Sequence, residues 1–186
     1  MTVKEIVKTA AALLSREDIT DYLSDKGTGA VKETMPSINV MVTLVNLVIS
    51  ELAGTYIPMV KSEKMNVVGG KIYYTEFSST PLKVKGVYDD KGRELSYVET
   101  ALYLQVNASS VVVEYQFVPP NYGLEEEIGY TEADVSCGAL AFGLAAEYSI
   151  CKGAFDEAVM WHKRYVESVN AAKKVKNATV KKRSWA

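Results

Sequence analysis

The segment SINVMVTLVNLVISELAGTYIPMVKSEKMNVVGGKIYYTEF, residues 37–77, decides the fold, because its hydrophobic period changes at Pro58. Before that proline, apolar residues recur at steps of three and four, as in an amphipathic helix. They are Ile38, Met41, Leu44, Val45, Val48, Leu52 and Tyr56. We expect the helix to begin at Pro36, which suits a first turn, and to end by Ile57, because a proline disfavours helical geometry in its predecessor. After Pro58 the period is two, which predicts strands.

The same helix has a wide apolar coverage, because Val40 and Leu47 lie off its main stripe. We therefore expect it to be central in the helical part or to contact a second chain. The apolar run Val40–Leu52 contains polar residues and is short, so we expect no membrane span. The opening Met-Thr-Val-Lys-Glu lacks the pattern of a signal peptide.

Between residues 59 and 117, the connections between predicted strands are too short to hold the crossover that parallel strands need, which favours antiparallel pairing. Six strands are expected: Met59–Val68, Lys71–Phe77, Pro81–Tyr88, Arg93–Val98, Leu102–Val106 and Val111–Phe117. Gly69 and Gly70 indicate a hairpin turn between the first two.

Helical patterns lie on both sides of these strands. Thr2 and Glu5 are spaced as a capping box, and Gly153 suits a helix end. The predicted helices are Val3–Leu14, a short one opened by Ser15–Asp18, one capped by Thr131–Asp134 that runs to Lys152, and one over Phe155–Lys174. In the last helix, Val159, His162, Val166 and either Val169 or Asn170 share one side. Asp25–Thr34 is expected to be a polar loop.

The predicted fold class is therefore α+β. A helical bundle of four to five helices, residues 1–58 and 130–174, receives an inserted antiparallel β-meander of about six short strands, residues 59–129. An extended basic C-terminal arm follows, residues 175–186.

Composition is that of a globular protein with one ordinary core: 186 residues, 48% hydrophobic and 24% charged. The net charge of −2 hides an asymmetry. Lys173–Ala186 holds six basic residues and no acid, which leaves 15 of the 21 basic residues against all 23 acidic ones, a body of net charge −8. An acidic body argues against a general nucleic-acid binder.

No catalytic, cofactor-binding or metal-binding constellation is evident, so we do not expect an enzyme. His162 is the one histidine, and no nucleophile or orienting carboxylate shares its helical face. Glu125–Glu127 lack further ligands, so we expect a solvated loop or a surface for a basic partner. Cys137 and Cys151 are 14 residues apart in one predicted helix, about 21 Å, too far for a disulfide. We expect both cysteines to be reduced and buried.

The basic arm is the most informative feature. Lys176, Lys181, Lys182, Arg183 and Trp185 combine cations with a large apolar anchor, which suits docking into an acidic, partly apolar groove on a protein. Contact with nucleic acid and a merely solubilising terminus remain the alternatives.

The whole pattern resembles the head–tail connector (adaptor, or head-completion) proteins of tailed bacteriophages. The resemblance rests on the order of elements, on VVVEYQFVPP (residues 111–120) followed by YTEAD (130–134), and on the closing helix FDEAVMWHKRY (155–165). In that family a helical body carries a β insertion, and the C-terminus is often an extended arm.

The resemblance implies a structural virion protein of the neck, assembled in the host cytoplasm. It implies a homo-oligomeric ring, typically of twelve copies, that docks its arms on the portal protein, extends the DNA channel and provides the attachment surface for tail or tail-hub proteins. Packaged DNA would be only the content of the channel, and neither cofactor nor membrane is implied.

Two other classes stay open. One is a nucleic-acid-binding module that uses the tyrosine-rich strands and the basic arm. The other is an enzyme with an unfamiliar site, which would need a pocket of perturbed acids.

Overall fold

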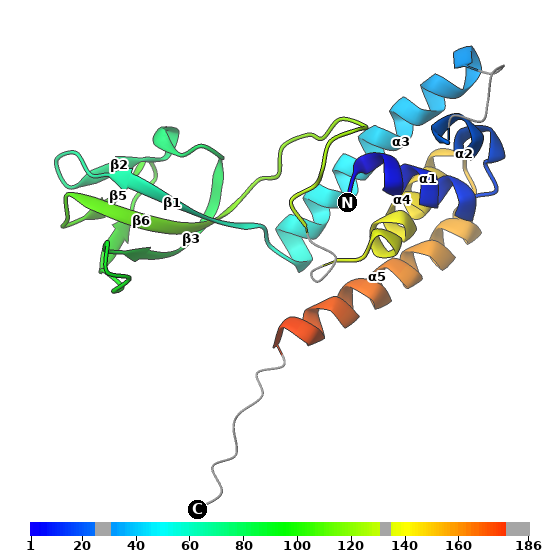
Figure 1. The fold of residues 1–186 in the computed structure, drawn as a ribbon. Helices are drawn as coiled ribbons and strands as arrows, with labels where there is room; N and C mark the ends of the chain where they lie inside the picture. Colours follow the sequence, from blue (N-terminus) through cyan, green and yellow to red (C-terminus); the bar gives the residue numbers. More distant parts are fainter. Residues whose placement is uncertain (25–30, 131–134, 178–186) are drawn as a thin grey trace, which may run out of the picture. The chain divides into compact units, whose positions relative to one another are not determined.

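The chain was analysed as a computed structural model, which describes residues 1–24, 31–130 and 135–177. It is an α+β protein with five α-helices and two small antiparallel sheets (Figure 1). The chain divides into two compact units, which are described separately. The helical unit comprises Met1–Leu52 and the chain from Asn121 onward, and the β unit comprises Ala53–Pro120.

The helical unit is built around α4. Its helices are α1 (Val3–Leu13), α2 (Glu17–Leu23), α3 (Val31–Glu51), α4 (Cys137–Cys151) and α5 (Phe155–Asn177). Helix α4 packs on α1, α3 and α5, and it is apolar on nearly all sides, with Glu147 as its one charged residue. Such a helix is stable only when it is covered on all sides. The central helix is therefore α4, whereas the sequence indicated α3 as a candidate for that place.

Local signals explain where several helices begin and end. The capping box of α1 is confirmed: Glu5 N donates to Thr2 Oγ1 at 3.2 Å, and Thr2 N donates to Glu5 Oε2 at 2.8 Å. Helix α4 ends in a Schellman motif, because Gly153 N donates to Ile150 O and Ala154 N to Ser149 O. Gly153 has a φ of 74°, a conformation that favours glycine.

Two predicted helix starts are wrong. Helix α4 begins at Cys137 with Ser136 as N-cap, whose hydroxyl accepts from Ala139 N at 3.1 Å. The predicted cap at residues 131–134 lies outside the described residues. Helix α3 begins at Val31, so Pro36 lies inside it rather than in its first turn. Helical backbone continues to Tyr56 as one π-helical stretch, Leu52–Tyr56, and ends before Pro58 as predicted.

The β unit consists of two three-stranded sheets. One has the order β1-β6-β3, from Val60–Asn66, Ser110–Phe117 and Pro81–Tyr88. The other has the order β2-β5-β4, from Lys71–Tyr73, Tyr103–Val106 and Tyr97–Glu99. A short 3₁₀ helix, Tyr74–Glu76, follows β2.

The predicted meander is wrong, because most strands pair with partners distant in sequence. Strand β1 pairs with β6 from Val60↔Gln116 to Asn66↔Ser110, while β2 pairs with β5. The turn at Gly69 and Gly70 does form, with φ of 59° and 75° and mutual hydrogen bonds between Val68 and Lys71. It does not close a long hairpin, because the strands on its two sides enter different sheets.

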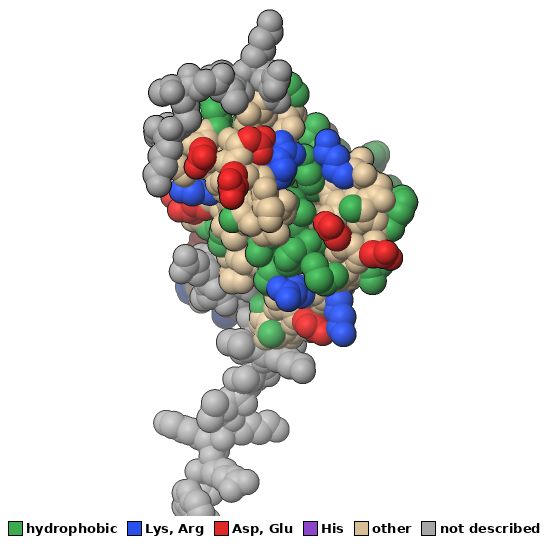
Figure 2. All heavy atoms as spheres, turned by 90° about the vertical axis from the view of Figure 1, so that its right-hand side faces the viewer, with side chains coloured by type: hydrophobic (Ala, Val, Ile, Leu, Met, Phe, Trp, Pro, Cys, Tyr) green, Lys and Arg blue, Asp and Glu red, His purple; other side chains and the backbone are tan. Residues whose placement is uncertain are grey.

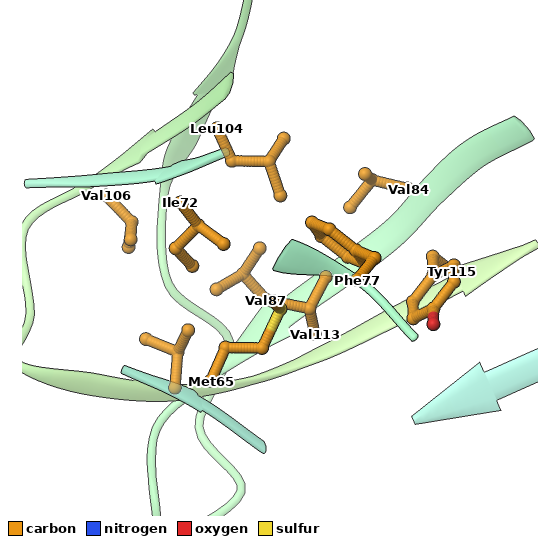
Figure 3. Close-up of a cluster of buried hydrophobic side chains, with 10 residues drawn as sticks. Met65, Ile72, Phe77, Val84, Val87, Leu104, Val106, Val113 and Tyr115 are labelled. Carbon is orange, nitrogen blue, oxygen red and sulfur yellow. The ribbon is translucent and has the colours of Figure 1, made fainter. Parts of the chain in front are cut away.

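The core of the β unit explains this topology. Strand β6 alternates buried and half-buried residues and is central in its sheet, where its apolar side chains meet those of the second sheet. Figure 3 shows these side chains pointing toward one another from both sheets. The cluster comprises Met65, Ile72, Phe77, Val84, Val87, Leu104, Val106, Val111, Val113 and Tyr115.

Candidate interaction surfaces

The described residues contain no group of three or more His, Cys, Asp or Glu side chains that could hold a metal ion. His162 is exposed on α5, and its ring lies 6.2 Å from the ring of Tyr165. Within the part of the chain that the structure describes, no hydrogen bond or ion pair joins it to a carboxylate or a nucleophile. The arrangement around His162 thus offers a surface side chain rather than an acid–base pair.

The acidic loop at Glu125–Glu127 contacts the beginning of α1. Val3 N donates to Glu126 O at 3.1 Å, and Lys4 N donates to Leu124 O at 2.8 Å. The Lys4 ammonium also lies 3.1 Å from the Glu125 carboxylate. The first turn of a helix has amide groups without intrahelical partners, and this loop satisfies two of them. Glu125 itself is exposed, so the loop combines a structural role with an acidic surface.

The two cysteines lie at opposite ends of α4 and form no disulfide. The prediction that both are buried is wrong: Cys137 is half-buried and Cys151 is exposed. They occupy the first and last positions of the helix, where neighbouring elements cover less of its surface than at its middle.

The sequence-predicted docking residues lie at the end of the chain. Lys176 belongs to the last turn of α5, and its side chain is not described. Lys181, Lys182, Arg183 and Trp185 lie outside the described residues. Docking through the arm therefore stays a prediction. Of the other surfaces, the sequence indicated only the side of α3 with Val40 and Leu47, as a possible contact with a second chain.

The outward face of α3 is the first of these surfaces. Opposite the residues that α3 buries lie Pro36, Val40, Thr43, Leu47 and Ser50, all of them exposed. Val40 is 44% exposed and Leu47 is 54% exposed. No charged residue occurs between Thr34 and Ser50. We call these five residues the α3 face.

The α3 face borders a hollow of about 430 Å³ lined by Thr43, Asn46, Leu47, Ser50 and Asn121. Asn46 anchors its wall: its Oδ1 accepts from Tyr122 N at 2.7 Å, and its Nδ2 donates to Tyr122 O at 2.9 Å. The hollow is therefore held open by hydrogen bonds that fix the chain beside α3.

The stretch Thr34–Tyr56 has the length and the mean hydropathy, 1.5, of a membrane-crossing helix. The helix is thus longer than the run Val40–Leu52 from which no membrane span was expected, and that expectation stays a prediction. Its other face is buried, with Met41 and Val45 at 0% and 1% exposure, and α3 packs on α1, α2 and α4. A helix in the core of a globular protein can have the same length and hydropathy. Burial explains why the inner face of α3 is apolar, but it does not explain the exposed Val40 and Leu47 on the opposite face.

The second surface lies on α5. The structure buries Ala158, Trp161, Tyr165 and Val169, so the predicted side with Val159 and His162 is not the buried one. Phe155 and Val159 are 66% and 71% exposed. At about 100° per residue, Phe155, Val159, His162 and Val166 form one uncharged stripe beside the buried one. We call these four residues the α5 face.

From Asp156 to Glu167 the charged residues of α5 lie elsewhere on the helix, whereas Lys173 lies two turns beyond Val166 on the same line. Asp156, Glu157, Lys163, Arg164 and Glu167 are all exposed and lie outside the α5 face. The apolar arc of α5 therefore covers roughly half of the helix circumference, about 180°, of which the unit buries only one part. Figure 2 shows one side of the molecule, on which hydrophobic side chains reach the surface among charged ones.

The tyrosine-rich strands of the β unit offer less to a ligand than their composition suggests. Phe77 and Tyr115 belong to the core, and their rings meet edge to face at 4.8 Å. Tyr73 is 43% exposed and contacts Tyr103, whose ring also carries the Lys71 ammonium at 4.7 Å. The aromatic side chains thus pack on one another and do not form an open row for stacking bases.

A carboxylate network stabilises the edge of the first sheet. The hydroxyl of buried Tyr115 donates to Glu63 Oε2 at 2.7 Å, and Ser78 N and Oγ lie 3.2 and 3.1 Å from the same oxygen. Burial acts to raise the pKa of Glu63, but the hydrogen bonds from Tyr115 and Ser78, with Lys61 nearby, hold the pKa below its usual value. The pKa of Tyr115 is raised mainly by burial and, to a lesser extent, by the hydrogen bond to the Glu63 carboxylate.

A hollow of about 610 Å³ in the β unit lies over the beginning of β3. Apolar side chains line part of it, including Leu82 at 53% exposure, and Lys83 and Glu99 lie at its wall. Its lining contains one carboxylate, that of Glu99, and no histidine or cysteine.

Comparison with known proteins adds no family assignment: no protein-family model matches this chain, and no curated protein matches it in sequence.

Proposed function

We propose that this protein is a structural virion component, a head–tail connector (adaptor) subunit that assembles into a ring and docks on the portal protein. The single observation that carries the assembly part is the pair of uncharged, exposed faces on α3 and α5. The exposed face of a helix in a monomeric unit usually carries charged side chains, which both of these faces lack. The connector role itself rests on the resemblance in the order of elements.

The charge distribution supports a place around a DNA channel. Outside the basic C-terminal segment the chain has a net charge of −8. Like charges repel, so packaged DNA would pass an acidic wall without adhering to it. The arm, with Lys181, Lys182, Arg183 and Trp185, would then tether each copy to the portal, and many tethers on one ring would add by avidity. Tail or tail-hub proteins would bind the opposite side of the ring.

The test is the mass of the purified protein in solution, measured by light scattering, alone and mixed with a candidate portal protein. We expect a complex of ring size with the portal. A matched variant that ends at Val175 should fold normally, as judged by circular dichroism, and lose the portal complex.

Other outcomes would redirect the assignment. If the protein stays monomeric with the portal, yet shifts in mass on addition of single-stranded nucleic acid in a steeply salt-dependent way, it is a nucleic-acid-binding module. If the variant ending at Val175 binds the portal as well as the full chain, the arm is not the tether.

A further inference from the structure

We propose that neighbouring copies of this chain contact each other heterologously, with the α5 face of one copy seated on the α3 face of the next. This inference deepens the proposed function, because it names the surfaces that would close the ring. The occupant of each face is thus a second copy of the same chain.

The first argument is the presence of two separate uncovered faces on one unit. Helices α3 and α5 both pack on α4, and each leaves an uncharged face exposed. An isologous contact between these faces would close at two copies, whereas the ring of the proposed function needs a contact that continues to a further copy. A heterologous contact covers both faces with a single kind of interface, and it repeats from copy to copy.

The second argument is charge. The α3 face carries no ionisable side chain, and His162 is the one titratable group on the α5 face. Burying a charged group without a partner costs several kcal/mol, so an uncharged face selects an uncharged counterpart. Elsewhere on its exposed surface α5 presents Glu157, Lys163 and Arg164, which would be desolvated without partners against the α3 face.

The third argument is shape. Phe155 and Val159 project from α5 with two thirds or more of their surface exposed. The α3 face borders a hollow lined by Thr43, Asn46, Leu47, Ser50 and Asn121, which offers a receiving site for such side chains. Projecting side chains of one helix that enter the grooves beside another are the usual mode of helix packing.

The size of the faces explains why the contact needs a ring. From Pro36 to Ser50 the α3 face is about 22 Å long, and a helix is about 10 Å wide, so the face covers roughly 200 Å². A stable pair of proteins buries about 800 Å² on each partner. One such contact is therefore weak, whereas a closed ring adds as many contacts as it has copies.

The test is cross-linking with a short bis-maleimide. Cys137→Ala and Cys151→Ser first remove the native thiols. Leu47→Cys and Val159→Cys are then introduced singly and together, and each protein is treated at a subunit concentration of about 1 mM, which populates even contacts with a Kd near 1 mM. Circular dichroism checks that every variant retains the fold.

We expect the double variant to give a ladder of dimer, trimer and higher species, and each single variant to stay monomeric. As the matched control, Val159→Cys is replaced by Glu157→Cys, which lies on the charged side of α5 and should give no ladder with Leu47→Cys.

Dimers from either single variant would overturn the proposal in favour of an isologous contact. Monomer alone from every variant, or a ladder of equal yield from the Glu157→Cys control, would also overturn it. The cross-linking result is independent of portal binding. A portal complex without the ladder would refute the contact between the α3 and α5 faces but not the connector role. A ladder without portal binding would support the contact and refute the connector role.

Discussion

Gly143 of α4 lies so close to Val48 of α3 that a Cβ atom at position 143 would stand 2.7 Å from Val48 Cγ1 and 3.1 Å from Tyr165 Cδ2. Helices α3 and α5 thus both approach α4 at a residue without a side chain. We expect Gly143→Ala to destabilise the helical unit by about 1–3 kcal/mol, the usual cost of overpacking a core. Urea unfolding followed by Trp161 fluorescence, in a Trp185→Phe background, measures this cost.

Gly138→Ala is the matched control, because it lies in the same helix and its added Cβ would meet only Ser136 Oγ, at 3.9 Å. Alanine favours a helix more than glycine does, so we expect no loss or a gain of up to about 1 kcal/mol. Equal losses from both substitutions would show that helix α4 does not approach α3 as closely as described.

Ser15 adopts a left-handed backbone conformation, with a φ of 55°, at the end of α1. Arg16 N donates to Ala11 O at 2.8 Å and Ser15 N to Ala12 O at 3.2 Å, which makes this a Schellman motif without its usual glycine. We expect Ser15→Gly to stabilise the helical unit by about 0.5–1 kcal/mol, because glycine adopts this conformation without steric strain. Thermal unfolding compared with Ser15→Ala, which keeps the strain and should gain nothing, tests the prediction.

Signals confined to neighbouring residues were readable from the sequence. The capping box at Thr2 and Glu5, the turn at Gly69 and Gly70, and the strand over Pro81–Tyr88 are all confirmed. Each depends on backbone preferences and hydrogen bonds within a few residues. The α+β class follows from the change of hydrophobic period and is confirmed as well.

Features that depend on distant partners were not readable. Periodicity cannot decide which of two adjacent apolar stripes is buried: the sequence grouped Val159 and His162 on one side, and the structure buries the adjacent side with Trp161 and Tyr165. The pairing of β1 with β6 is likewise set by a core shared between two sheets. Of the two interaction surfaces, the α3 face could be found in part from the sequence, because Val40 and Leu47 lie off the main apolar stripe of their helix.

Asn46 looked like an interruption of an apolar helix, but the structure gives it a role. It holds both the N–H and the C=O of Tyr122, a residue that is 9% exposed. We expect Asn46→Ala to cost about 2–3 kcal/mol, since two poorly hydrated backbone groups lose their partners. Urea unfolding measures the loss, and Asn39→Ala on an exposed position of the same helix should change stability by less than about 0.5 kcal/mol. Equal effects would contradict the anchoring role.

The Tyr115–Glu63 hydrogen bond should make the stability of the β unit depend on pH. The pKa of Glu63 is lower in the folded chain than in the unfolded one, so its contribution is present above the unfolded pKa of about 4.3 and is lost as the pH falls through the folded value. We expect Tyr115→Phe to cost about 1–2 kcal/mol at pH 7, because this hydrogen bond has a charged acceptor. The difference from the unaltered protein should shrink as the pH falls through the lowered pKa of Glu63 in the folded chain, because a protonated Glu63 no longer offers a charged acceptor.

Urea unfolding from pH 3 to 7, followed by NMR of the Val113 and Leu104 methyl groups, checks this dependence within the β unit. Glu63→Gln is the complementary variant: it keeps an acceptor for the Tyr115 hydroxyl but removes the charge, so its stability should vary less with pH below about 4.3. Some dependence should persist, because the hydrogen bond from Arg16 lowers the pKa of Asp18, and the Arg93 backbone amide lowers that of Asp89. A cost of Tyr115→Phe that stays constant across this range would show that Tyr115 contributes through packing alone.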